Sequence, residues 1–236
     1  LMMASCAQEQ RSMVDYALSF LDYPYVAGSL EGNEEEQLVV DLTGFDCTTL
    51  VETCLALSID SANFEQELQR IRYRDGIIDG YTSRLHYMTD WVADNEARGI
   101  VRDMTCEIGG EPFAPDLYYM SKNHRLYPHL KDNKENVEKI TAVETHINQR
   151  TDYCYIPTDK IDLIADSIRD GDMLFFTTSI PGLDVQHAGI AYHRKNGQLG
   201  FIHASSKAKK VIIEPLSLSD YCRKQKTITG IMVVRR

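Results

Sequence analysis

The spacing of apolar residues changes from helical to extended about two thirds of the way along this 236-residue chain. Before residue 168, apolar side chains recur every three or four positions, which predicts amphipathic helices over residues 8–22, 63–73 and 131–143. From residue 168 onwards, short apolar runs are separated by turn residues, which predicts strands. These runs are residues 173–177, 185–192, 200–205, 211–213 and 231–234. Helices followed by strands predict an α+β fold.

One further helix begins close to a cysteine. Apolar residues return at helical spacing directly after the segment Gly44–Phe45–Asp46–Cys47. Asp46 or Thr43 can cap the first turn of this helix. Cys47 therefore lies at or near a helix N-terminus, where free N–H groups and the helix dipole favour a thiolate, the form that attacks a carbonyl. The alternative interpretation is a small buried cysteine of the core.

Two histidines lie on consecutive predicted strands, His187 in residues 185–192 and His203 in residues 200–205. A cysteine at a helix start, followed by histidines on later strands, is the order found in papain-like cysteine hydrolases. In that arrangement one histidine is the base and a third polar group orients it. The three segments together are a much more specific signal than any one of them.

The loop between these two strands decides whether both histidines face the same side. A two-residue turn at Asn196–Gly197 would place residue 190 opposite His203, which would then face away from His187. A three-residue loop over residues 195–197, with Gly197 left-handed, would make the two histidines diagonal neighbours on one face. The mechanism requires the second case, so we predict an odd-length loop or a bulge.

Charge and hydropathy exclude several classes of partner. The net charge is −10 without a basic block, which argues against a nucleic-acid partner and against a polybasic membrane contact. No run of about 20 apolar residues is present, so no transmembrane segment is predicted. Small residues precede Cys6, a pattern that resembles a bacterial lipoprotein cleavage site. We expect residues 1–9 to be a truncated leader or lipoprotein-like tail, with Cys6 as the candidate lipid anchor, or else a secretory remnant. Residues 10–236 are expected to form a single, monomeric catalytic domain.

The remaining cysteines give no sign of a metal or redox motif. No C-x-x-C pair occurs, so a zinc ribbon is not indicated. Cys47 and Cys54 are separated by about 10 Å along one helix, too far for a disulfide. We expect four cysteines to be buried, inert thiols: Cys54, Cys106, Cys154 and Cys222.

Several of these motifs together resemble the NlpC-type cell-wall hydrolases, papain-like enzymes that cut amide bonds in peptidoglycan. The motifs are Pro24–Tyr25 with Gly28, Asp46–Cys47 at a helix start, His187–Ala188–Gly189–Ile190 and His203–Ala204. That family usually shows Asp-Cys-Ser-Gly, whereas this chain has Asp46–Cys47–Thr48–Thr49. The departure, together with residues 84–91, resembles the N-acetylmuramoyl-L-alanine amidase-like branch, long classed as a domain of unknown function. The resemblance extends over nearly the whole chain from about residue 10.

The resemblance implies a papain-like NlpC-type fold, in which the nucleophile helix packs on an antiparallel sheet, with a large, mostly helical insertion at about residues 63–165. It implies Cys47 as nucleophile, His187 as base, His203 as orienting residue and Tyr25 as a hydrogen-bonding neighbour of the cysteine. The bond cut would join N-acetylmuramic acid to L-alanine; the sibling alternative is the bond between D-glutamate and a diamino acid. The implied partners are muropeptides, and the implied location is the bacterial cell envelope, as a periplasmic protein or an outer-membrane lipoprotein. No cofactor is implied.

Residues 81–91 combine Arg, His and Tyr with the single Trp of the chain, a composition suited to sugar and carboxylate recognition. Arg84 could bind a carboxylate through two hydrogen bonds. The alternatives are that Tyr87 and Trp91 belong to the core, which we favour for Trp91, and that Arg84 is a surface charge. We expect substrate contacts from six residues: Asp46, Ser83, Arg84, His86, Tyr87 and Asp184. Three further histidines are expected at the surface: His124, His129 and His146.

Two other functions are compatible with the same residues. A zinc site could be built from Cys47, His187 and His203, or from Asp184 with the histidines, and three ligands plus water would suit a metalloamidase. The spacing matches no familiar zinc motif, so no metal is predicted. The second function is a non-catalytic wall-binding protein on the same scaffold, against which the three intact catalytic positions argue.

Overall fold

The computed structural model describes residues 11–236. The predicted leader, residues 1–9, and the candidate anchor Cys6 lie outside the described residues. No helix within residues 11–236 is long and apolar enough to cross a membrane.

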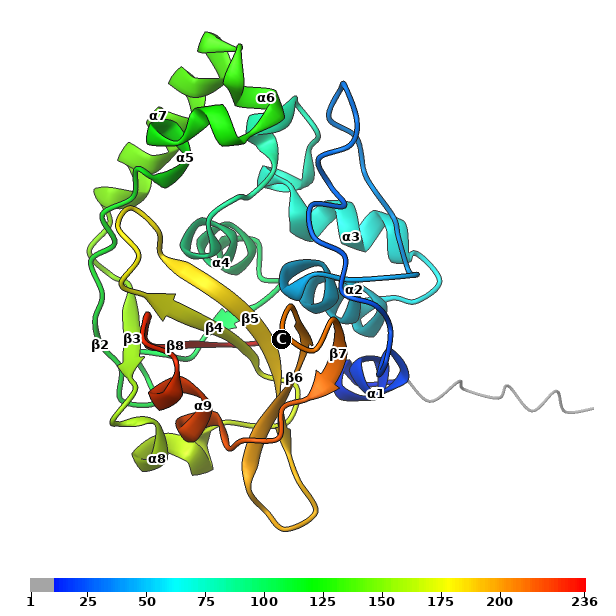
Figure 1. The fold of residues 1–236 in the computed structure, drawn as a ribbon, viewed down its shortest axis with the longest axis vertical. Helices are drawn as coiled ribbons and strands as arrows, with labels where there is room; N and C mark the ends of the chain where they lie inside the picture. The colour runs from blue at the N-terminus through cyan, green and yellow to red at the C-terminus, as the bar shows by residue number, and fades with distance from the viewer. Residues whose placement is uncertain (1–10) are drawn as a thin grey trace, which may run out of the picture.

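An antiparallel sheet forms the centre of the molecule (Figure 1). Its strand order is β2-β3-β8-β4-β5-β6-β7, and β1 pairs with β8 outside this path. All five predicted strands are present and are extended by a few residues. The strands are β1 (Arg102–Asp103), β2 (Glu111–Pro112), β3 (Cys154–Pro157), β4 (Met173–Thr178), β5 (Val185–His193), β6 (Leu199–Ser205), β7 (Lys210–Ile213) and β8 (Ile228–Arg235).

Helices cover both faces of this sheet. The predicted helices are found in the N-terminal and middle parts of the chain, with boundaries shifted by a few residues. The helices are α1 (Met13–Ser19), α2 (Cys47–Ile59), α3 (Phe64–Arg72), α4 (Met88–Ala97), α5 (Tyr119–Lys122), α6 (Pro128–Lys131), α7 (Lys134–Asn148), α8 (Ile161–Ile164) and α9 (Leu218–Lys224). Helices before strands, packed as layers, confirm the α+β class.

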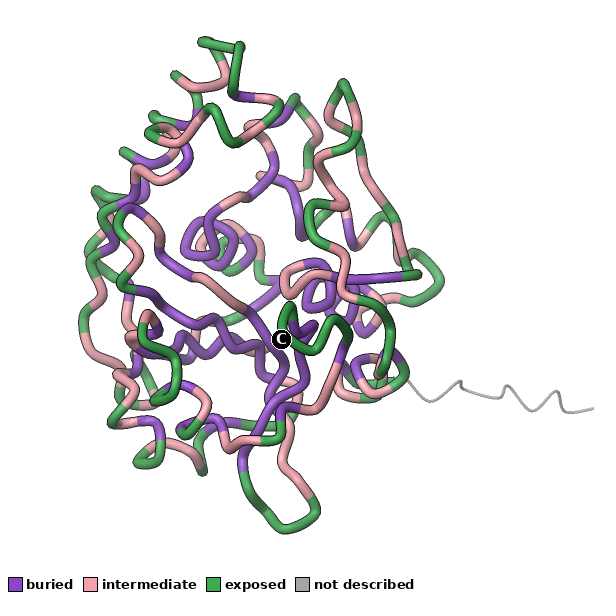
Figure 2. The backbone as a smooth tube through the Cα atoms, in the orientation of Figure 1, coloured by how far each residue is buried: buried purple, intermediate pink, exposed green. Residues whose placement is uncertain are grey.

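The central strands carry apolar residues on both faces because each face of the sheet packs against helices. In β4, Met173 and Phe175 join the cluster formed with α1 to α4, whereas Leu174 and Phe176 join the cluster formed with α8 and α9. All six residues of β4 are consequently buried, and purple runs through the central strands in Figure 2. The sheet therefore has a packed core on both faces, and its internal strands β5 and β6 carry His187 and His203.

Part of the predicted insertion, residues 63–165, has a core of its own. Tyr87 from the start of the α4 segment packs with residues of α5 to α7, such as Met120 and Ile140. By contrast, α3 and α4 contribute to the main cluster through Leu68 and Trp91, respectively. The core interpretation of Tyr87 and Trp91 is confirmed, since each side chain is about 1% exposed. The division into one domain with an insertion remains a prediction.

The prediction of four inert thiols is wrong for two of them. Cys106 and Cys154 form a disulfide, with their Cα atoms 5.3 Å apart. Pairing of β2 with β3 places Cys154 opposite Pro112, and the Gly110 N–H donates to Thr105 O in a turn that brings Cys106 back to β3. A separation of 48 residues gives no local signal of this approach. Cys54 and Cys222 are buried free thiols, as predicted.

Candidate active site

Cys47 is the first residue of α2, as the capping pattern predicted. Asp46 is the N-cap: its Oδ1 accepts from the Thr49 N–H at 2.8 Å, and the Thr49 hydroxyl oxygen accepts from the Asp46 N–H at 2.9 Å. This reciprocal pair fixes the first turn of the helix. Gly44 allows the preceding segment to pack closely, because a Cβ there would lie 2.5 Å from a methyl carbon of Val26. Asp46 therefore has a structural role next to the cysteine.

The strand hairpin has the loop that the mechanism requires. The Arg194 N–H donates to Gln198 O at 3.0 Å, which closes a loop of residues 195–197, and Gly197 has a φ of 80°. Ile190 is consequently paired with Ile202, and both histidines lie on one face. The predicted odd-length loop is confirmed. His187 Nε2 lies 2.6 Å from His203 Nδ1.

A β-bulge lies beside His187. Phe176 of β4 is opposite His187, but the next residue, Thr177, is opposite Val185, so Gln186 is the extra residue on β5. Bulges of this kind redirect side chains and are common next to active sites. Here the bulge lets Gln186 and His187 line the same cavities although they are adjacent in sequence. The Thr178 hydroxyl donates to Gln186 Oε1 at 2.6 Å and holds that side chain.

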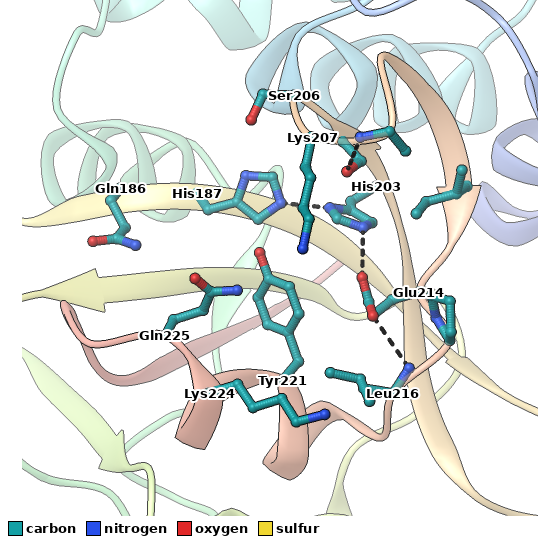
Figure 3. A pocket seen from close by; sticks show the side chains of 14 residues that line it. Gln186, His187, His203, Ser206, Lys207, Glu214, Leu216, Tyr221, Lys224 and Gln225 are labelled. Carbon is teal, nitrogen blue, oxygen red and sulfur yellow. Dashed lines mark hydrogen bonds and ion pairs between the residues drawn. The ribbon is translucent and has the colours of Figure 1, made fainter.

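Glu214 places a carboxylate beside the histidine pair and was not predicted from the sequence. Glu214 Oε2 lies 3.3 Å from His203 Nε2, and Glu214 Oε1 accepts from the Leu216 N–H at 3.1 Å (Figure 3). His203 is paired with Ile212 across β6 and β7, so Glu214, two residues further, is its diagonal neighbour on the same face. Glu214 could have been predicted from the sequence only through this pairing of β6 with β7. Burial alone would raise the pKa of Glu214, but its contacts with His203 and with the Leu216 N–H lower that pKa instead.

Cys47 and His187 are both neutral in the substrate-free site. Burial and the adjacent Asp46 carboxylate raise the pKa of Cys47 to about 11, against smaller opposing effects of the Ala188 and Thr48 backbone. Burial, with a further contribution from His203, lowers the pKa of His187 to about 3. Loss of solvent around the sulfur therefore outweighs the preference of the helix N-terminus for a thiolate.

Two cavities meet at His187. A small cavity of about 100 Å³ is lined by Cys47, Thr48 and His187 among others. A larger cavity of about 830 Å³ is lined by His187, His203 and Tyr221 among others (Figure 3). Gln186 and His187 belong to both. A substrate that spans both cavities would therefore pass the cysteine and its histidine in sequence.

Tyr25 lies beside the cysteine. It is bridged to Phe45, two residues before Cys47, and its N–H donates to Lys209 O at 2.9 Å. Burial, together with the neighbouring Cys47 and Asp46, raises the pKa of Tyr25. The phenol therefore stays protonated and can donate a hydrogen bond near the sulfur.

Two of the six predicted substrate contacts, His86 and Asp184, line the small cavity with Cys47. Burial, with a smaller effect of Arg84, lowers the pKa of His86 to about 3. The buried Asp184 carboxylate accepts from the Thr89 N–H and hydroxyl, each at 2.8 Å, and from the Val185 N–H at 2.7 Å. Asp184 thus fastens the start of α4 to the start of β5.

Ser83, Arg84 and Tyr87 line neither of these cavities. The Arg84 guanidinium is paired with Glu31 at 3.0 Å and with Glu36 at 3.2 Å. Arg84 was expected to bind a carboxylate of the substrate, whereas in the structure it binds two carboxylates of the protein itself. The Ser83 hydroxyl donates to a carbonyl of its own turn at 2.7 Å. The Tyr87 hydroxyl donates to Glu144 at 2.7 Å inside the insertion.

The surface prediction for three histidines holds for His146, which is exposed, whereas His124 and His129 are half-buried. The His129 ring stacks on Tyr81, with ring centroids 4.7 Å apart. Within residues 11–236, the His, Cys, Asp and Glu side chains form no group of three arranged to hold a metal ion. The facing nitrogens of His187 and His203, considered above as zinc ligands, are instead hydrogen-bonded to each other.

Comparison with known proteins gives the family. Residues 15–230 match the family described as N-acetylmuramoyl-L-alanine amidase-like. An N-acetylmuramoyl-L-alanine amidase from Bacteroides uniformis has a similar structure, with 40% identity and a TM-score of 0.90 over 95% of this chain and 97% of that one. A Bacteroides fragilis protein with a provisional xylanase name has 41% identity and a TM-score of 0.89 over 94% and 99% of the two chains.

A more distant Legionella pneumophila protein has 25% identity and a TM-score of 0.70 over 95% of this chain and 89% of that one. Comparison with curated proteins finds no match. Because the family match spans nearly all the described residues, this chain belongs to the N-acetylmuramoyl-L-alanine amidase-like family.

Proposed function

We propose that this chain is a cysteine amidase that hydrolyses the amide bond between N-acetylmuramic acid and L-alanine in peptidoglycan or its fragments. The observation that carries the proposal is the connected series His187, His203 and Glu214, which begins in the cavity of Cys47. The family supports the choice of bond. The papain-like NlpC-type relationship, implied by the sequence motifs, belongs to this proposal as well.

The series determines which nitrogen of each histidine ring carries the proton. An ionised Glu214, 3.3 Å from His203 Nε2, favours the proton on that nitrogen, which leaves His203 Nδ1 without a proton. His203 Nδ1 then accepts from His187 Nε2–H across the 2.6 Å contact. His187 Nδ1 is left unprotonated and free to accept a proton from the Cys47 thiol. Glu214 thereby sets the tautomer of a histidine that it does not touch.

Reaction begins from the neutral pair. As the substrate carbonyl carbon approaches Cys47 Sγ, the thiol proton passes to His187 Nδ1 and the sulfur forms a bond to carbon. The resulting charge on His187 is stabilised through His203 by the Glu214 carboxylate. His187 then donates the proton to the amide nitrogen, the C–N bond breaks, and the peptide leaves with a free amine. Water, deprotonated by His187, attacks the thioester and releases the carboxylic acid and the thiol.

Two donors can stabilise the negative charge on the carbonyl oxygen. The Cys47 N–H is at the first position of α2, where N–H groups have no partner within the helix. The Tyr25 hydroxyl, which stays protonated, is the second donor.

We also propose that the protein works in the cell envelope. The Cys106–Cys154 disulfide supports this location, because disulfides persist in oxidising compartments outside the cytoplasm. Peptidoglycan, the proposed substrate, is found in the same place.

The test is mass spectrometry of defined muropeptides incubated with the wild type, with Cys47→Ala and with Cys54→Ala as the matched control. Cys54 is a buried thiol two turns further along α2. We expect free stem peptide and free muramoyl sugar from the wild type and from Cys54→Ala, and none from Cys47→Ala. Cleavage inside the stem would support the sibling activity between D-glutamate and the diamino acid. Full activity of Cys47→Ala would disprove the thiol mechanism.

A further inference from the structure

Two lysines extend along the larger cavity from opposite sides. Lys207 belongs to the loop between β6 and β7, and Lys224 is the last residue of α9. Both line the cavity that also contains His187 and Tyr221 (Figure 3). Within residues 11–236, neither ammonium group has a carboxylate within ion-pair distance, whereas the neighbouring Lys210 is paired with Asp22 at 2.6 Å. A chain of net charge −10 thus presents two uncompensated cations at its proposed cleft.

The proposed mechanism determines which end of the substrate lies on each side of His187. The carbonyl carbon of the substrate must reach Cys47, and the amide nitrogen must reach His187, because His187 protonates the leaving amine. The acyl carbonyl therefore lies on the Cys47 side of His187, and the peptide side continues past His187. The cavity beyond His187 is the larger one, with a volume of about 830 Å³, enough for a short peptide.

Substrate chemistry then predicts where charge should lie. The muramoyl sugar and its lactyl carbonyl are neutral at the amide bond. On the peptide side, the residue after L-alanine is a D-glutamate joined to its successor through the side chain, so its α-carboxylate is free. Two residues of extended chain span about 7 Å, which places this carboxylate well inside the larger cavity.

We propose that Lys207 and Lys224 form a subsite for the α-carboxylate of the second stem-peptide residue, with Gln186 as a neutral hydrogen-bonding neighbour. This inference rests on the proposed function and extends it to the substrate: the enzyme distinguishes stems with a free α-carboxylate from stems with an α-carboxamide. The other charged group of the cavity, Glu214, is held by His203 and the Leu216 N–H, beyond ion-pair distance of both lysines. Lysine binds such a group as a mobile point charge, which suits a peptide of variable length.

The experiment compares two substrates that differ in one group. They are N-acetylmuramoyl-L-alanyl-D-glutamate, with a free α-carboxylate, and N-acetylmuramoyl-L-alanyl-D-isoglutamine, with an α-carboxamide. For the wild type we expect kcat/KM on the order of tenfold higher for the carboxylate, the effect of one charge-assisted hydrogen bond. The Lys207→Gln/Lys224→Gln double variant should cleave both substrates equally. High salt should reduce the wild-type preference, because both lysines are exposed.

The matched control is Lys195→Gln, which removes one exposed charge at the tip of the β5–β6 loop, outside both cavities. This control should keep the wild-type preference. Equal cleavage of both substrates by the wild type would overturn the subsite, and so would an unchanged preference in the double variant.

A separate binding measurement keeps the subsite testable if the proposed function fails. If the wild type cleaves neither substrate, calorimetry compares the binding of L-alanyl-γ-D-glutamate and L-alanyl-D-isoglutamine to the same protein. Tighter binding of the carboxylate form, lost in the double variant, supports the subsite even without amidase activity. Equal binding, or no binding of either peptide, overturns it.

Discussion

His187 Nε2 and His203 Nδ1 lie 2.6 Å apart, and the other ring nitrogen of His203, Nε2, lies 3.3 Å from Glu214 Oε2. A glutamine at position 214 could donate to His203 Nε2, which would reverse both tautomers and leave His187 Nδ1 protonated. We expect Glu214→Gln to lower kcat by about 10- to 100-fold, with KM nearly unchanged, as for other residues that orient a catalytic group through a neighbour.

Glu214→Asp is the matched control, because it keeps the charge and shortens the side chain. We expect Glu214→Asp to retain more activity than Glu214→Gln, while thermal denaturation shows both variants folded. Equal loss in the two variants would indicate that the packing of this side chain matters and its charge does not.

The sequence predicted the parts of the site that depend on local rules. Cys47 was found because N-cap chemistry and helical spacing are local, and the histidine pair because the length of one loop sets which face a strand presents. Glu214 was missed because its meaning depends on pairing of a third strand with the strand of His203. Arg84 was assigned to substrate because its true partners, Glu31 and Glu36, lie about 50 residues earlier in a loop without periodic pattern.

Gly189 keeps the two histidine strands together. A Cβ at this position would lie 2.7 Å from Phe201 Cδ2 and 3.1 Å from Ile202 O, both on β6. We expect Gly189→Ala to destabilise the protein by about 1–3 kcal/mol, the usual range for overpacking. It should also lower kcat, since β6 must shift and carries His203 with it. Urea denaturation and kinetics measure the two effects; Gly32→Ala, where a Cβ meets open space, should change neither.

Arg84 should stabilise the fold without affecting substrate affinity. Its guanidinium is 5% exposed and is paired with Glu31 and Glu36, so its removal leaves the 4%-exposed Glu36 carboxylate without a cation, with the Tyr73 hydroxyl as its remaining donor. We expect Arg84→Gln to lower the free energy of unfolding by about 3 kcal/mol, with KM unchanged. Adding Glu36→Gln should cost less than the sum of the single changes, because the pair is already broken. A raised KM at unchanged stability would restore the substrate role predicted from sequence.

Acid should destabilise the protein through two histidines near the cysteine. The pKa values of His86 and His187 are both lowered to about 3, so these side chains stay neutral in the folded state where the unfolded chain binds protons. Their contribution to the free energy of unfolding is therefore fully present above the unfolded pKa of about 6.5. It is lost as the pH drops below that value, by at most about 1.4 kcal/mol per pH unit for each histidine.

His86→Gln should reduce the slope of the free energy of unfolding against pH between pH 6.5 and 5 by the contribution of one histidine. Urea denaturation at several pH values measures this slope. His146→Gln, at an exposed site, is the control and should leave the slope unchanged. A wild-type slope that matches that of His86→Gln would mean that His86 titrates normally in the folded protein.

The Cys106–Cys154 disulfide should contribute to stability and leave catalysis unaffected. It closes a long segment of chain, with a sequence separation of 48 residues, which restricts the unfolded state. Chain entropy alone gives a contribution of about 4 kcal/mol, and measured values are usually 2–4 kcal/mol. We expect Cys106→Ser/Cys154→Ser to lower the free energy of unfolding in this range at unchanged kcat, since neither residue lines the two cavities at His187. Reductant should destabilise the wild type to the same level and leave the double variant unaffected. A loss of kcat in the folded double variant would instead show that this disulfide helps to position the site, because it ties the turn between β1 and β2 to β3, the strand beside β8.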